Sequence, residues 1–565
     1  MNGTGRFALV RQLMASGINC MFGNPGSSEE SILDVLRYEE FSSFQYYLAF
    51  QEGTAVAMAD SYARATQRPA VVQLHSYAGL ANGLGMMYYA RRGYTPIVVF
   101  VGEAGLKYDA LDGQMAADLV SMARPFVKAD YNGPCAWRVV DPGSLLRLLR
   151  RALKSAATPP MGPVFLSFPM DILDLENVEP VSASSPVQSD VAPSQAIVDR
   201  AARLLAAAEV PIILAGDGVA ACGAQAELTK VAELLGATVY GVNYSEVNMP
   251  ASHPLYGGQT GHMFGADSQP ITSSGDAVLI CSTTVMPEVF PSLEGVFKKG
   301  AHLIHFDLNS YEIAKNFPVT IGALASPKPA LGLLAQRLEA LVGGEQRARA
   351  RDRIQSQSRR KAAQYEKELA ADVLHRDQVP LRASQFMEEL GKRLPPGSLI
   401  FDEALTNSPE LCRYLPQDEP GTFFQTRSGM LGTGLPGTVG LKIAHPEKIV
   451  VGFSGDGGSI STIQALATAA RHSIGAKFVV LNNGSYRILK YNLQRYWQDQ
   501  GEPIDQPFPK SFDLDGPQLR FDKFAEAQGV NSVRVTNSAQ IGPALDSAFQ
   551  DDKPFLIDLV VSGDL

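Results

Sequence analysis

Short apolar runs alternate with helix-forming segments along most of this chain, and that alternation is the feature that most restricts its fold. In the first third, strand-like runs at residues 70–74 and 97–102 flank a small-residue helix at residues 80–90. Strands that alternate with helices in this way are typical of a parallel sheet covered by helices. Two later blocks repeat the pattern, and a length of 565 residues agrees with about three domains. The sequence therefore predicts an α/β fold of three consecutive doubly wound parallel-sheet domains.

Two polar segments mark the expected domain boundaries. Residues 181–195 are rich in Ser, Pro and Ala without periodicity, which is typical of a linker. Residues 343–379 are highly charged and have no apolar stripe wide enough for a core, which favours a solvated linking helix. We therefore expect an N-terminal domain at residues 1–180, a middle domain at 196–342 and a C-terminal domain at 380–565.

Composition excludes several classes of protein. With 45% hydrophobic and 19% charged residues, the chain can bury ordinary cores and is not globally disordered. A net charge of −9 gives no general attraction for nucleic acid or an anionic membrane surface. The apolar runs are far shorter than the ~20 residues that span a bilayer.

The cysteines and the N-terminal segment bear on location. The five cysteines lie far apart without CxxC spacing, so neither a disulfide framework nor a zinc site is expected. The first residues read as an amphipathic helix that leads into a strand, without the order of a signal peptide. These features predict a cytoplasmic protein whose partner is a small molecule.

A Gly-Asp-Gly turn and an Asn-Asn pair follow two consecutive strands of the third block. Gly455-Asp456-Gly457 follows one apolar strand, and Asn482-Asn483 follows the next, with one helical crossover between them. The carboxyl ends of parallel strands meet at one edge of a sheet, where such sheets bind ligands. Asp456, Asn483 and a backbone carbonyl near Ser485 would supply hard oxygen ligands there. Ligands of this kind suit Mg²⁺, which leaves room for phosphates.

Each of these motifs has a plainer interpretation by itself, and a competing fingerprint lies upstream. Gly455–Gly458 alone is a tight turn, and Asn482-Asn483 alone ends a strand, but their joint spacing favours a metal site. Gly432–Gly437 matches GxGxxG, with Asp456 nineteen residues further on, which is formally a dinucleotide-binding pattern. The preceding segment FFQTRSGML lacks the buried run expected of a central strand, so a nicotinamide-dependent dehydrogenase stays an alternative. A second turn, Gly216–Gly218, lacks an Asn-Asn partner, and we expect no flavin there.

Polar residues of the first block also lie at strand or helix ends on the expected ligand edge. Glu52 opens a helix rich in Ala and Met, where an acid also complements the helix dipole. His75 follows the strand AVVQL, where a hydrogen-bonded turn residue is the plainer interpretation. Ser27 ends the turn FGNPGS, directly after another strand.

Together these residues carry a resemblance over nearly the full length. The chain resembles the thiamine-diphosphate-dependent 2-oxoacid decarboxylase and carboligase superfamily, whose GDG motif is followed some twenty-seven residues later by NN, as it is here. Glu52 in QEGTAVAMADSYARA matches the activating glutamate of that family. The segments GNPGS, LHSYAGLANG and GDGGSISTIQALATAARHSIGAKFVVLNNGSY are most similar to the benzoylformate decarboxylase subfamily. The resemblance implies pyrimidine-binding, middle and diphosphate-binding domains in that order.

The resemblance also implies a cofactor site of thiamine diphosphate and Mg²⁺. Asp456, Asn483 and the Ser485 carbonyl would hold Mg²⁺, which bridges the cofactor's diphosphate. Leu431 matches the apolar wedge beneath the cofactor, and the Gly429 carbonyl matches the acceptor for its aminopyrimidine. The other implied cofactor contacts are Thr406, Gly455, Gly457, Gly458, Ser459 and Tyr486.

The implied catalytic roles follow from the chemistry of that cofactor. Glu52 would favour the imino tautomer of the aminopyrimidine, whose nitrogen removes the thiazolium C2 proton. Ser27 would orient the substrate carboxylate, and His75 would relay protons or steady a developing alkoxide. Glu52 would reach the cofactor of another subunit, which implies a homo-oligomer, at least a dimer and in our expectation a tetramer.

The chain departs from the subfamily at the substrate pocket. The subfamily has a second active-site histidine where this chain has CSTTVMPEVFPSLEG, which contains none. Glu288 lies near that place and is a predicted pocket residue. His262 is a candidate replacement, with a structural role as the plainer interpretation. Ile488 and Asn492 stand where the subfamily has a smaller residue and an aromatic one.

These observations predict an enzyme that decarboxylates an aromatic 2-oxo acid, such as benzoylformate, to the aldehyde and CO₂ without oxidation, with carboligation as a side activity. One alternative is a carboligase or lyase with the same cofactor, of the acetolactate synthase, benzaldehyde lyase or 2-hydroxyacyl-CoA lyase kind. From other classes, the alternatives are the dehydrogenase and a catalytically silent binding protein.

Overall fold

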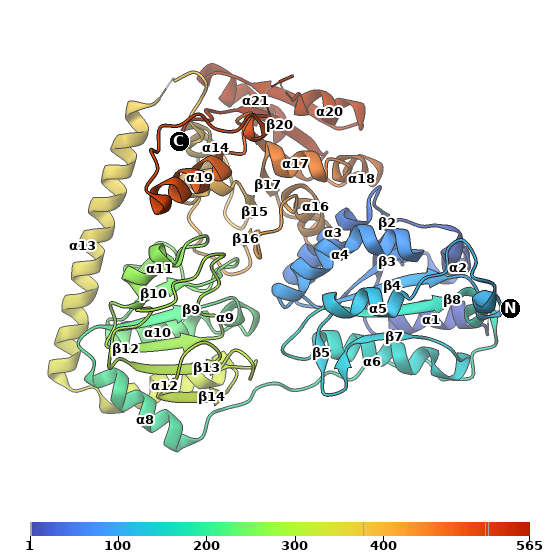
Figure 1. The fold of residues 1–565 in the computed structure, drawn as a ribbon, viewed down its shortest axis with the longest axis horizontal. Coiled ribbons are helices and arrows are strands. Elements are labelled where there is room, and N and C mark those ends of the chain that lie inside the picture. Colours follow the sequence, from blue (N-terminus) through green and yellow to red (C-terminus); the bar gives the residue numbers. More distant parts are fainter. Residues whose placement is uncertain (1–2, 377, 515, 518) are drawn as a thin grey trace. The chain divides into compact units, whose positions relative to one another are not determined.

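The computed structural model (Figure 1) describes residues 3–376, 378–514, 516–517 and 519–565. The chain divides into two compact units. The first unit is made of residues 1–187, 377–408 and 428–565, and the second of residues 188–376 and 409–427. Among the described residues, three large sheets form the frame. This confirms the α/β architecture of three sheets that the alternating pattern predicts.

The N-terminal part of the first unit is a parallel sheet with the strand order β2-β1-β3-β4-β8-β7. Its strands are β1 (Cys20–Gly23), β2 (Gln45–Leu48), β3 (Ala70–His75), β4 (Ile97–Glu103), β7 (Ala136–Arg138) and β8 (Val164–Pro169). Its helices are α1 (Gly5–Ala15), α2 (Glu30–Val35), α3 (Glu52–Thr66), α4 (Ser76–Arg92), α5 (Leu119–Ala123), α6 (Leu145–Ala157) and α7 (Met170–Asp174). A small antiparallel pair joins β5 (Ala129–Asp130) and β6 (Gly133–Pro134).

Both faces of this sheet are buried under helices, as is usual for parallel strands. Along β3, Val72 and Leu74 face the layer that contains α3 and α4, whereas Val71 faces the layer that contains α1 and α6. This is the period of two that a strand imposes on its side chains. The polar residues that follow the strands are therefore left at the sheet's edge.

The C-terminal part of the first unit holds strands in the order β15-β17-β18-β20-β19. They are β15 (Leu399–Glu403), β17 (Val450–Gly455), β18 (Lys477–Asn482), β19 (Asn531–Val535) and β20 (Phe555–Val560). The helices are α14 (Ala383–Gly391), α16 (Gly434–Ala444), α17 (Asp456–Ser461), α18 (Ala465–Arg471), α19 (Arg487–Gln500), α20 (Phe521–Ala527) and α21 (Ile541–Ala548).

The crossover between β17 and β18 differs from the single helix that the sequence predicts. It consists of the two short helices α17 and α18, because Thr462 leaves the helical conformation with φ −134° and ψ 24°. The two strands are nevertheless parallel neighbours, with Gly455 paired to Leu481. The Gly-Asp-Gly and Asn-Asn motifs therefore lie side by side, as predicted.

Helices α3 and α16 join the two sheets of the first unit. A Cβ atom added at Gly440 of α16 would lie 2.2 Å from the carbonyl oxygen of Met58 in α3, so only glycine permits this approach. Val56 of α3 and Val439 of α16 belong to one buried apolar cluster. Both helices begin at the ligand edge of their sheet, α3 at Glu52 and α16 after the loop that ends at Thr433.

The second unit is a parallel sheet with the strand order β11-β10-β9-β12-β13-β14. Its strands are β9 (Pro211–Ala215), β10 (Thr238–Gly241), β11 (Tyr256–Gln259), β12 (Ala277–Cys281), β13 (His302–Asp307) and β14 (Ile321–Leu324). Its helices are α8 (Gln195–Ala207), α9 (Gly218–Ala221), α10 (Gln225–Leu235), α11 (Gly265–Thr272), α12 (Pro327–Leu341) and α13 (Gly344–Leu374). The order 3-2-1-4-5-6 is that of doubly wound nucleotide-binding sheets.

Residues 409–427, which include all of α15 (Ser408–Tyr414) except its first residue, belong to the second unit. In β16 (Phe423–Gln425), the backbone N–H of Gln425 donates to the carbonyl of Ser245, in the loop after β10, at 2.8 Å. This segment of the C-terminal third thus belongs to the second unit.

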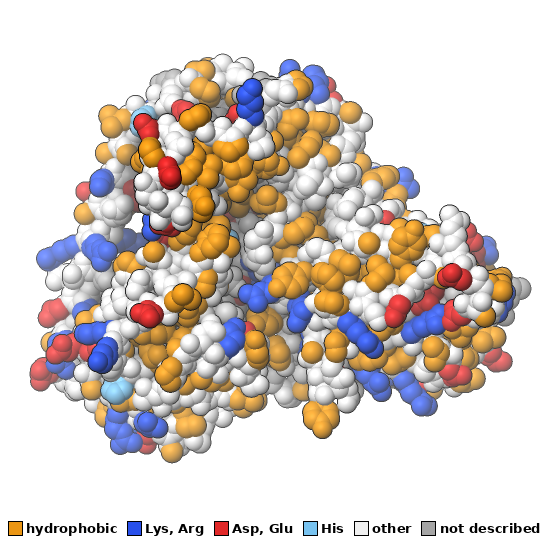
Figure 2. All heavy atoms as spheres, in the orientation of Figure 1, with side chains coloured by type: hydrophobic (Ala, Val, Ile, Leu, Met, Phe, Trp, Pro, Cys, Tyr) orange, Lys and Arg blue, Asp and Glu red, His pale blue; other side chains and the backbone are white. Residues whose placement is uncertain are grey.

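Helix α13 is the charged helix that the sequence predicts after the middle block. Lys and Arg side chains stand out along it in Figure 2, and Ala350 is its buried residue among those described. Its polar side chains bind other parts of the second unit, since Gln357 donates to Thr238 of β10 at 2.7 Å and Lys361 donates to the His253 carbonyl at 2.8 Å. Among the described residues, no helix has the length and apolar character needed to cross a membrane.

Candidate active site

Asp456 and Asn483 meet at the carboxyl ends of β17 and β18. The Asp456 carboxylate accepts from the backbone N–H of Gly457 at 2.8 Å and from that of Gly484 at 2.7 Å, so it bridges both turns. The side-chain oxygen of Asn483 accepts from the Ser485 N–H at 2.9 Å. Burial raises the pKa of Asp456 to about 6, against the opposing hydrogen bonds from backbone amides. A divalent cation beside this carboxylate would favour its charged form.

The turns around Asp456 are closely packed on one side and open on the other. A Cβ atom at Gly457 would lie 2.4 Å from the ring of Tyr486, whereas one at Gly455 would meet nothing within 4 Å. Tyr486 is fixed by its N–H, which donates to the Phe512 carbonyl at 2.8 Å. The predicted residues Gly455, Asp456, Gly457, Asn483, Ser485 and Tyr486 thus form one cluster beside open space.

The loop that contains Gly429 and Leu431 runs close to α17. Gly429 and Gly432 have φ values of +69° and +83°, which glycine adopts without strain. A Cβ atom at Gly432 would lie 2.3 Å from the Ser461 hydroxyl of α17. Leu431 is 38% exposed, which leaves an apolar side chain on the loop available to a bound molecule.

Glu403 holds this loop in place, and sequence reasoning missed it. Its fully buried carboxylate accepts from the backbone N–H groups of Gly432 at 2.6 Å, Thr433 at 3.0 Å and Gly434 at 2.7 Å. It also accepts from the Ser454 hydroxyl at 2.8 Å. Burial raises the pKa of Glu403, and these donors oppose that shift. An acid at the end of the apolar strand LIFDE is the signal that would have found it.

Replacing Glu403 with Gln should loosen the loop at residues 428–434. The amide can accept at one oxygen only, and its NH₂ group then faces at least one of the backbone donors. Because an unsatisfied buried N–H costs about 1–3 kcal/mol, we expect the cofactor that the sequence resemblance implies to bind about tenfold more weakly or worse. Hydrogen exchange of the loop and calorimetric titration of the cofactor would measure both effects. Glu388→Gln, which removes an ion pair with Lys392 on α14, is the control, and equal behaviour of the two variants would contradict the assignment.

Several hydroxyl groups beside the loop and α17 are buried with no hydrogen-bond partner among the described residues. They belong to Ser428, Ser459 and Thr462. Buried hydroxyls in proteins are nearly always hydrogen-bonded, so this cluster fits a polar group of a bound molecule. Thr406 lies half-buried in a 3₁₀ turn (Leu405–Asn407) directly after β15.

Glu52 lies at the ligand edge of the N-terminal sheet with both oxygens held. Asn24, in the turn after β1, donates to one oxygen at 2.9 Å, and Asn82 of α4 donates to the other at 3.0 Å. A Cβ atom at Gly79 would lie 3.4 Å from Cγ of Glu52 and 3.5 Å from the backbone of Leu74. Glu52 is therefore a neighbour of the end of β3, and it is not a solvated first-turn acid.

His75 ends β3 and contacts two residues that sequence reasoning passed over. Its Nδ1 lies 2.9 Å from the hydroxyl of Ser28 and 2.9 Å from a carboxylate oxygen of Glu29. Ser27, which the resemblance implies as the residue that orients the substrate carboxylate, is exposed. The structure therefore brings His75 and Glu52 to the same sheet edge. Ser27 directly precedes the buried residues Ser28 and Glu29 in the chain.

The predicted pocket residues lie on separate elements. Ile488 and Asn492 lie on α19, where Asn492 has a buried side-chain oxygen without a partner among the described residues. Glu288 and His262 lie near each other in the second unit, where the Ser268 hydroxyl donates to Glu288. Burial lowers the pKa of His262, and Glu288 opposes that shift. Their contribution to catalysis stays a prediction.

The second Gly-Asp-Gly turn is packed shut. A Cβ atom at Gly216 would lie 2.5 Å from Cβ of Thr283, and one at Gly218 would lie 2.4 Å from Cβ of Ser282. The carboxylate of Asp217 accepts from the Ser245 N–H at 2.8 Å. The turn at Asp456, with its open glycine, differs in having room for a ligand.

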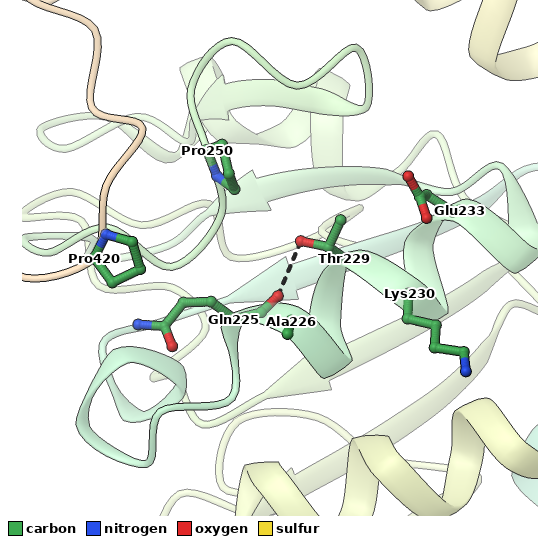
Figure 3. A pocket seen from close by; sticks show the side chains of 7 residues that line it. All are labelled: Gln225, Ala226, Thr229, Lys230, Glu233, Pro250 and Pro420. Atoms are coloured by element: carbon green, nitrogen blue, oxygen red, sulfur yellow. Dashed lines mark hydrogen bonds between the residues drawn. The ribbon is translucent and has the colours of Figure 1, made fainter.

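A pocket of about 470 Å³ on the second unit is not lined by any of the predicted site residues. It is lined by Gln225, Ala226, Thr229, Lys230, Glu233, Pro250 and Pro420 (Figure 3). The Thr229 hydroxyl donates to the Gln225 carbonyl of its own helix at 2.9 Å. Lys230 and Glu233 point away from Gln225 and from each other in Figure 3.

The fold and these clusters define a doubly wound α/β protein with clusters of polar residues at the carboxyl ends of its strands. Three domains of the thiamine pyrophosphate enzymes match the chain: the N-terminal TPP binding domain at residues 3–122, the central domain at 198–334 and the C-terminal TPP binding domain at 406–559. The chain belongs to the thiamine pyrophosphate enzyme family, and thiamine pyrophosphate, also called thiamine diphosphate, is its cofactor. Mg²⁺ is the usual partner metal in this family.

Similar proteins match over almost their whole length. Benzoylformate decarboxylase of Pseudomonas aeruginosa is 28% identical over 555 residues, which cover 97% of each chain. The probable acetolactate synthase large subunit of Methanococcus aeolicus is 25% identical and covers 99% of this chain and 92% of that protein. The Rhodococcus jostii thiamine diphosphate-dependent 4-hydroxybenzoylformate decarboxylase has a similar structure, with a TM-score of 0.83 at 24% identity over 99% of both chains.

These findings confirm the resemblance that the sequence carries. The alternative of a nicotinamide-dependent dehydrogenase is wrong, because the GxGxxG segment at Gly432–Gly437 lies inside the C-terminal TPP binding domain. Gly432 serves the close approach of the loop to α17, and Gly434 serves its close approach to Glu403.

Proposed function

We propose that this enzyme decarboxylates an aromatic 2-oxo acid such as benzoylformate, releasing the aldehyde and CO₂ without oxidation. The observation that carries the proposal is His75, whose Nδ1 is held at 2.9 Å by Glu29 and Ser28 beside Glu52 at one sheet edge. The full-length similarity to benzoylformate decarboxylase of Pseudomonas aeruginosa supports the choice of substrate.

The residues present fit the cofactor of the family. Asp456, Asn483 and the Ser485 carbonyl offer the oxygen ligands that suit Mg²⁺. We propose that Thr406 and Ser459 contact the diphosphate, with Gly455, Gly457, Gly458 and Tyr486 shaping the cradle. Leu431 would support the cofactor from below, and the Gly429 carbonyl would accept a hydrogen bond from it. When bound, thiamine diphosphate supplies a carbon nucleophile and an electron sink for the bond that breaks as CO₂ leaves.

Three side chains of the N-terminal sheet would complete the reaction. Glu52, held by Asn24 and Asn82, exchanges a proton with the cofactor's aminopyrimidine through a carboxylate oxygen. Nε2 of His75 takes up a proton from solvent and delivers it to the substrate oxygen. Ser27, exposed on the neighbouring turn, orients the substrate carboxylate.

The test is product analysis with purified enzyme, thiamine diphosphate and Mg²⁺. Benzoylformate should give benzaldehyde and CO₂ only when the cofactor is present, and it should be consumed faster than pyruvate. Pyruvate alone and benzaldehyde alone are the controls. Acetolactate from pyruvate, with benzoylformate untouched, would contradict the decarboxylase assignment and favour the carboligase alternative, which the similarity to the acetolactate synthase subunit supports.

We further propose that Glu52 serves the cofactor held by a second copy of the chain, so that the active form is at least a dimer, and a tetramer in our expectation. In this proposal residues 1–180 bind the pyrimidine of one cofactor, and residues 380–565 bind the diphosphate of another. Residues 196–342 form the middle domain between them. We retain the prediction of a cytoplasmic location from the odd number and wide spacing of the cysteines.

Mixing two inactive variants tests this sharing. Glu52→Gln and Asp456→Asn damage different halves of the proposed site, so a hybrid dimer has one doubly damaged site and one intact site. After exchange of subunits, we expect about a quarter of wild-type activity, because half of the dimers are hybrids with one of two sites intact. Each variant mixed with itself is the control. Activity that stays at the level of the single variants would show that each chain builds its own site.

A further inference from the structure

A buried carboxylate that no step above uses lies against His75. Glu29 has 0% side-chain exposure, and its carboxylate receives four donors from four directions. Gly26 N–H at 3.0 Å and His75 Nδ1 at 2.9 Å approach one oxygen. The other oxygen accepts from the Ser28 hydroxyl at 2.8 Å and from the Gly102 N–H at 2.8 Å. An ionised carboxylate accepts at about four positions, so this set satisfies the charged form.

These contacts determine which nitrogen of His75 carries the proton. Ser28 has one hydroxyl proton and donates it to Glu29, so its oxygen can only accept from the imidazole. Glu29 also accepts from Nδ1. Two acceptors at one nitrogen require an N–H there, which leaves the lone pair of the neutral ring on Nε2. Among the described residues, Nε2 has no hydrogen-bond partner, and the His75 side chain is 21% exposed.

The arrangement differs from a hydrolase triad. In such a triad the serine binds one ring nitrogen and the acid binds the other. Here Ser28 and Glu29 both bind Nδ1, so Ser28 cannot be the nucleophile that His75 activates. By binding Nδ1, Ser28 and Glu29 therefore leave Nε2 free for proton transfer.

The backbone around the ring fixes its position. A Cβ atom at Gly26 would lie 2.2 Å from the His75 ring, so the turn packs directly on the imidazole. Ser76 has a φ of +49°, which is unfavourable for a residue other than glycine and is retained mainly where the surroundings impose it. Its hydroxyl donates to the Met115 carbonyl at 3.3 Å.

We propose that Glu29 is a positioning residue that keeps the proton of His75 on Nδ1 and balances the charge of the ring when Nε2 takes up a second proton. The cycle conserves atoms, since Nε2 takes a proton from solvent, delivers it to the substrate oxygen and takes it back as the aldehyde forms, while the Nδ1 proton stays in place. This inference rests on the proposed function for the step that Nε2 performs, and the state of the ring follows from the contacts alone.

Replacing Glu29 with Gln tests the inference. With the amide oxygen toward Gly102 and Ser28, the NH₂ group faces both Nδ1 and the N–H of Gly26, and it moves the ring proton to Nε2. We expect kcat for benzoylformate to fall by about 10²-fold, with little change in KM, because the proton-transfer group has the wrong tautomer. Glu29→Asp, which keeps a carboxylate, should recover part of the activity. In a His75→Ala background, Glu29→Gln should have no further effect.

The matched control is Glu179→Gln. Glu179 is a buried carboxylate of the same sheet domain and accepts from the backbone of Leu146 at 2.9 Å. Glu179→Gln should lower the melting temperature but should not lower kcat more than this loss of stability explains. If Glu29→Gln and Glu179→Gln lower activity in proportion to the same loss of stability, the positioning role is refuted.

A second measurement does not depend on turnover. Diethylpyrocarbonate modifies an accessible imidazole nitrogen that carries a lone pair, and peptide mass spectrometry of the full-length enzyme reports the rate at His75, with the exposed His302 as internal reference. We expect the rate at His75 to fall several-fold in Glu29→Gln and to recover in Glu29→Asp. Equal rates in wild type and Glu29→Gln would overturn the inference. A slower rate in an enzyme that does not decarboxylate benzoylformate would support the positioning of His75 and refute the proposed substrate alone.

Discussion

Replacing Glu52 with Gln should lower turnover by about 10²- to 10⁴-fold, the usual contribution of a positioned acid or base. The enzyme should still bind thiamine diphosphate, because an amide fills the same space between Asn24 and Asn82. Those two amides hold the Glu52 oxygens at 2.9 and 3.0 Å, which fixes the carboxylate for one proton transfer. Steady-state kinetics together with calorimetric titration of the cofactor would separate catalysis from binding.

The control for Glu52 is another acid in the first turn of a helix. Glu30 opens α2 and is exposed, so Glu30→Gln removes a comparable interaction with a helix dipole and nothing else. We expect it to retain full turnover. If Glu52→Gln were equally active, Glu52 would be only a helix-terminal acid and the catalytic assignment would fail.

Replacing Asp456 with Asn should remove the metal-dependent affinity for thiamine diphosphate. The substitution keeps the shape of the side chain but deletes the charge that faces the proposed Mg²⁺, and it places an amide NH₂ group near the N–H groups of Gly457 and Gly484. Loss of one charged ligand should weaken binding by more than the 10- to 100-fold typical of outer partners at a metal site. Titration of thiamine diphosphate with and without Mg²⁺ measures the effect.

The chain contains its own control for this substitution. Asp217 stands in the same Gly-Asp-Gly sequence but receives the Ser245 N–H at 2.8 Å in a turn that is packed shut. Asp217→Asn should destabilise the second unit and leave the affinity for cofactor unchanged. If it abolished cofactor binding while Asp456→Asn did not, the proposed metal site would be in the wrong domain.

The sequence predicts the Asp456 cluster because each of its motifs directly follows a strand. Consecutive parallel strands joined by one crossover are usually neighbours, so the spacing alone places Asp456 beside Asn483. The pairing of Gly455 with Leu481 confirms this. The break of the crossover at Thr462 is not predictable in the same way, since the segment has no Pro or Gly to mark it.

The partners of the predicted residues are harder to find in a sequence. Asn24 is 28 residues from Glu52, and Glu29 is 46 residues from His75, so these pairs form only after the strands have assembled. Glu29 reads locally as an ordinary acid at a helix start. Glu403 reads as the polar end of a strand. The roles of Glu29 and Glu403 depend on their burial, and the local sequence pattern does not predict whether a single charged residue is buried.

The account rests most directly on Glu52 acting on the cofactor that the Asp456 cluster holds. Exchange of the C2 proton of bound thiamine diphosphate with deuterium, followed by NMR after rapid quenching, measures that action without any substrate. We expect fast exchange in the wild-type enzyme with Mg²⁺ and a rate close to that of free cofactor in Glu52→Gln. Equal exchange rates in the two proteins, with cofactor bound in both, would contradict the account.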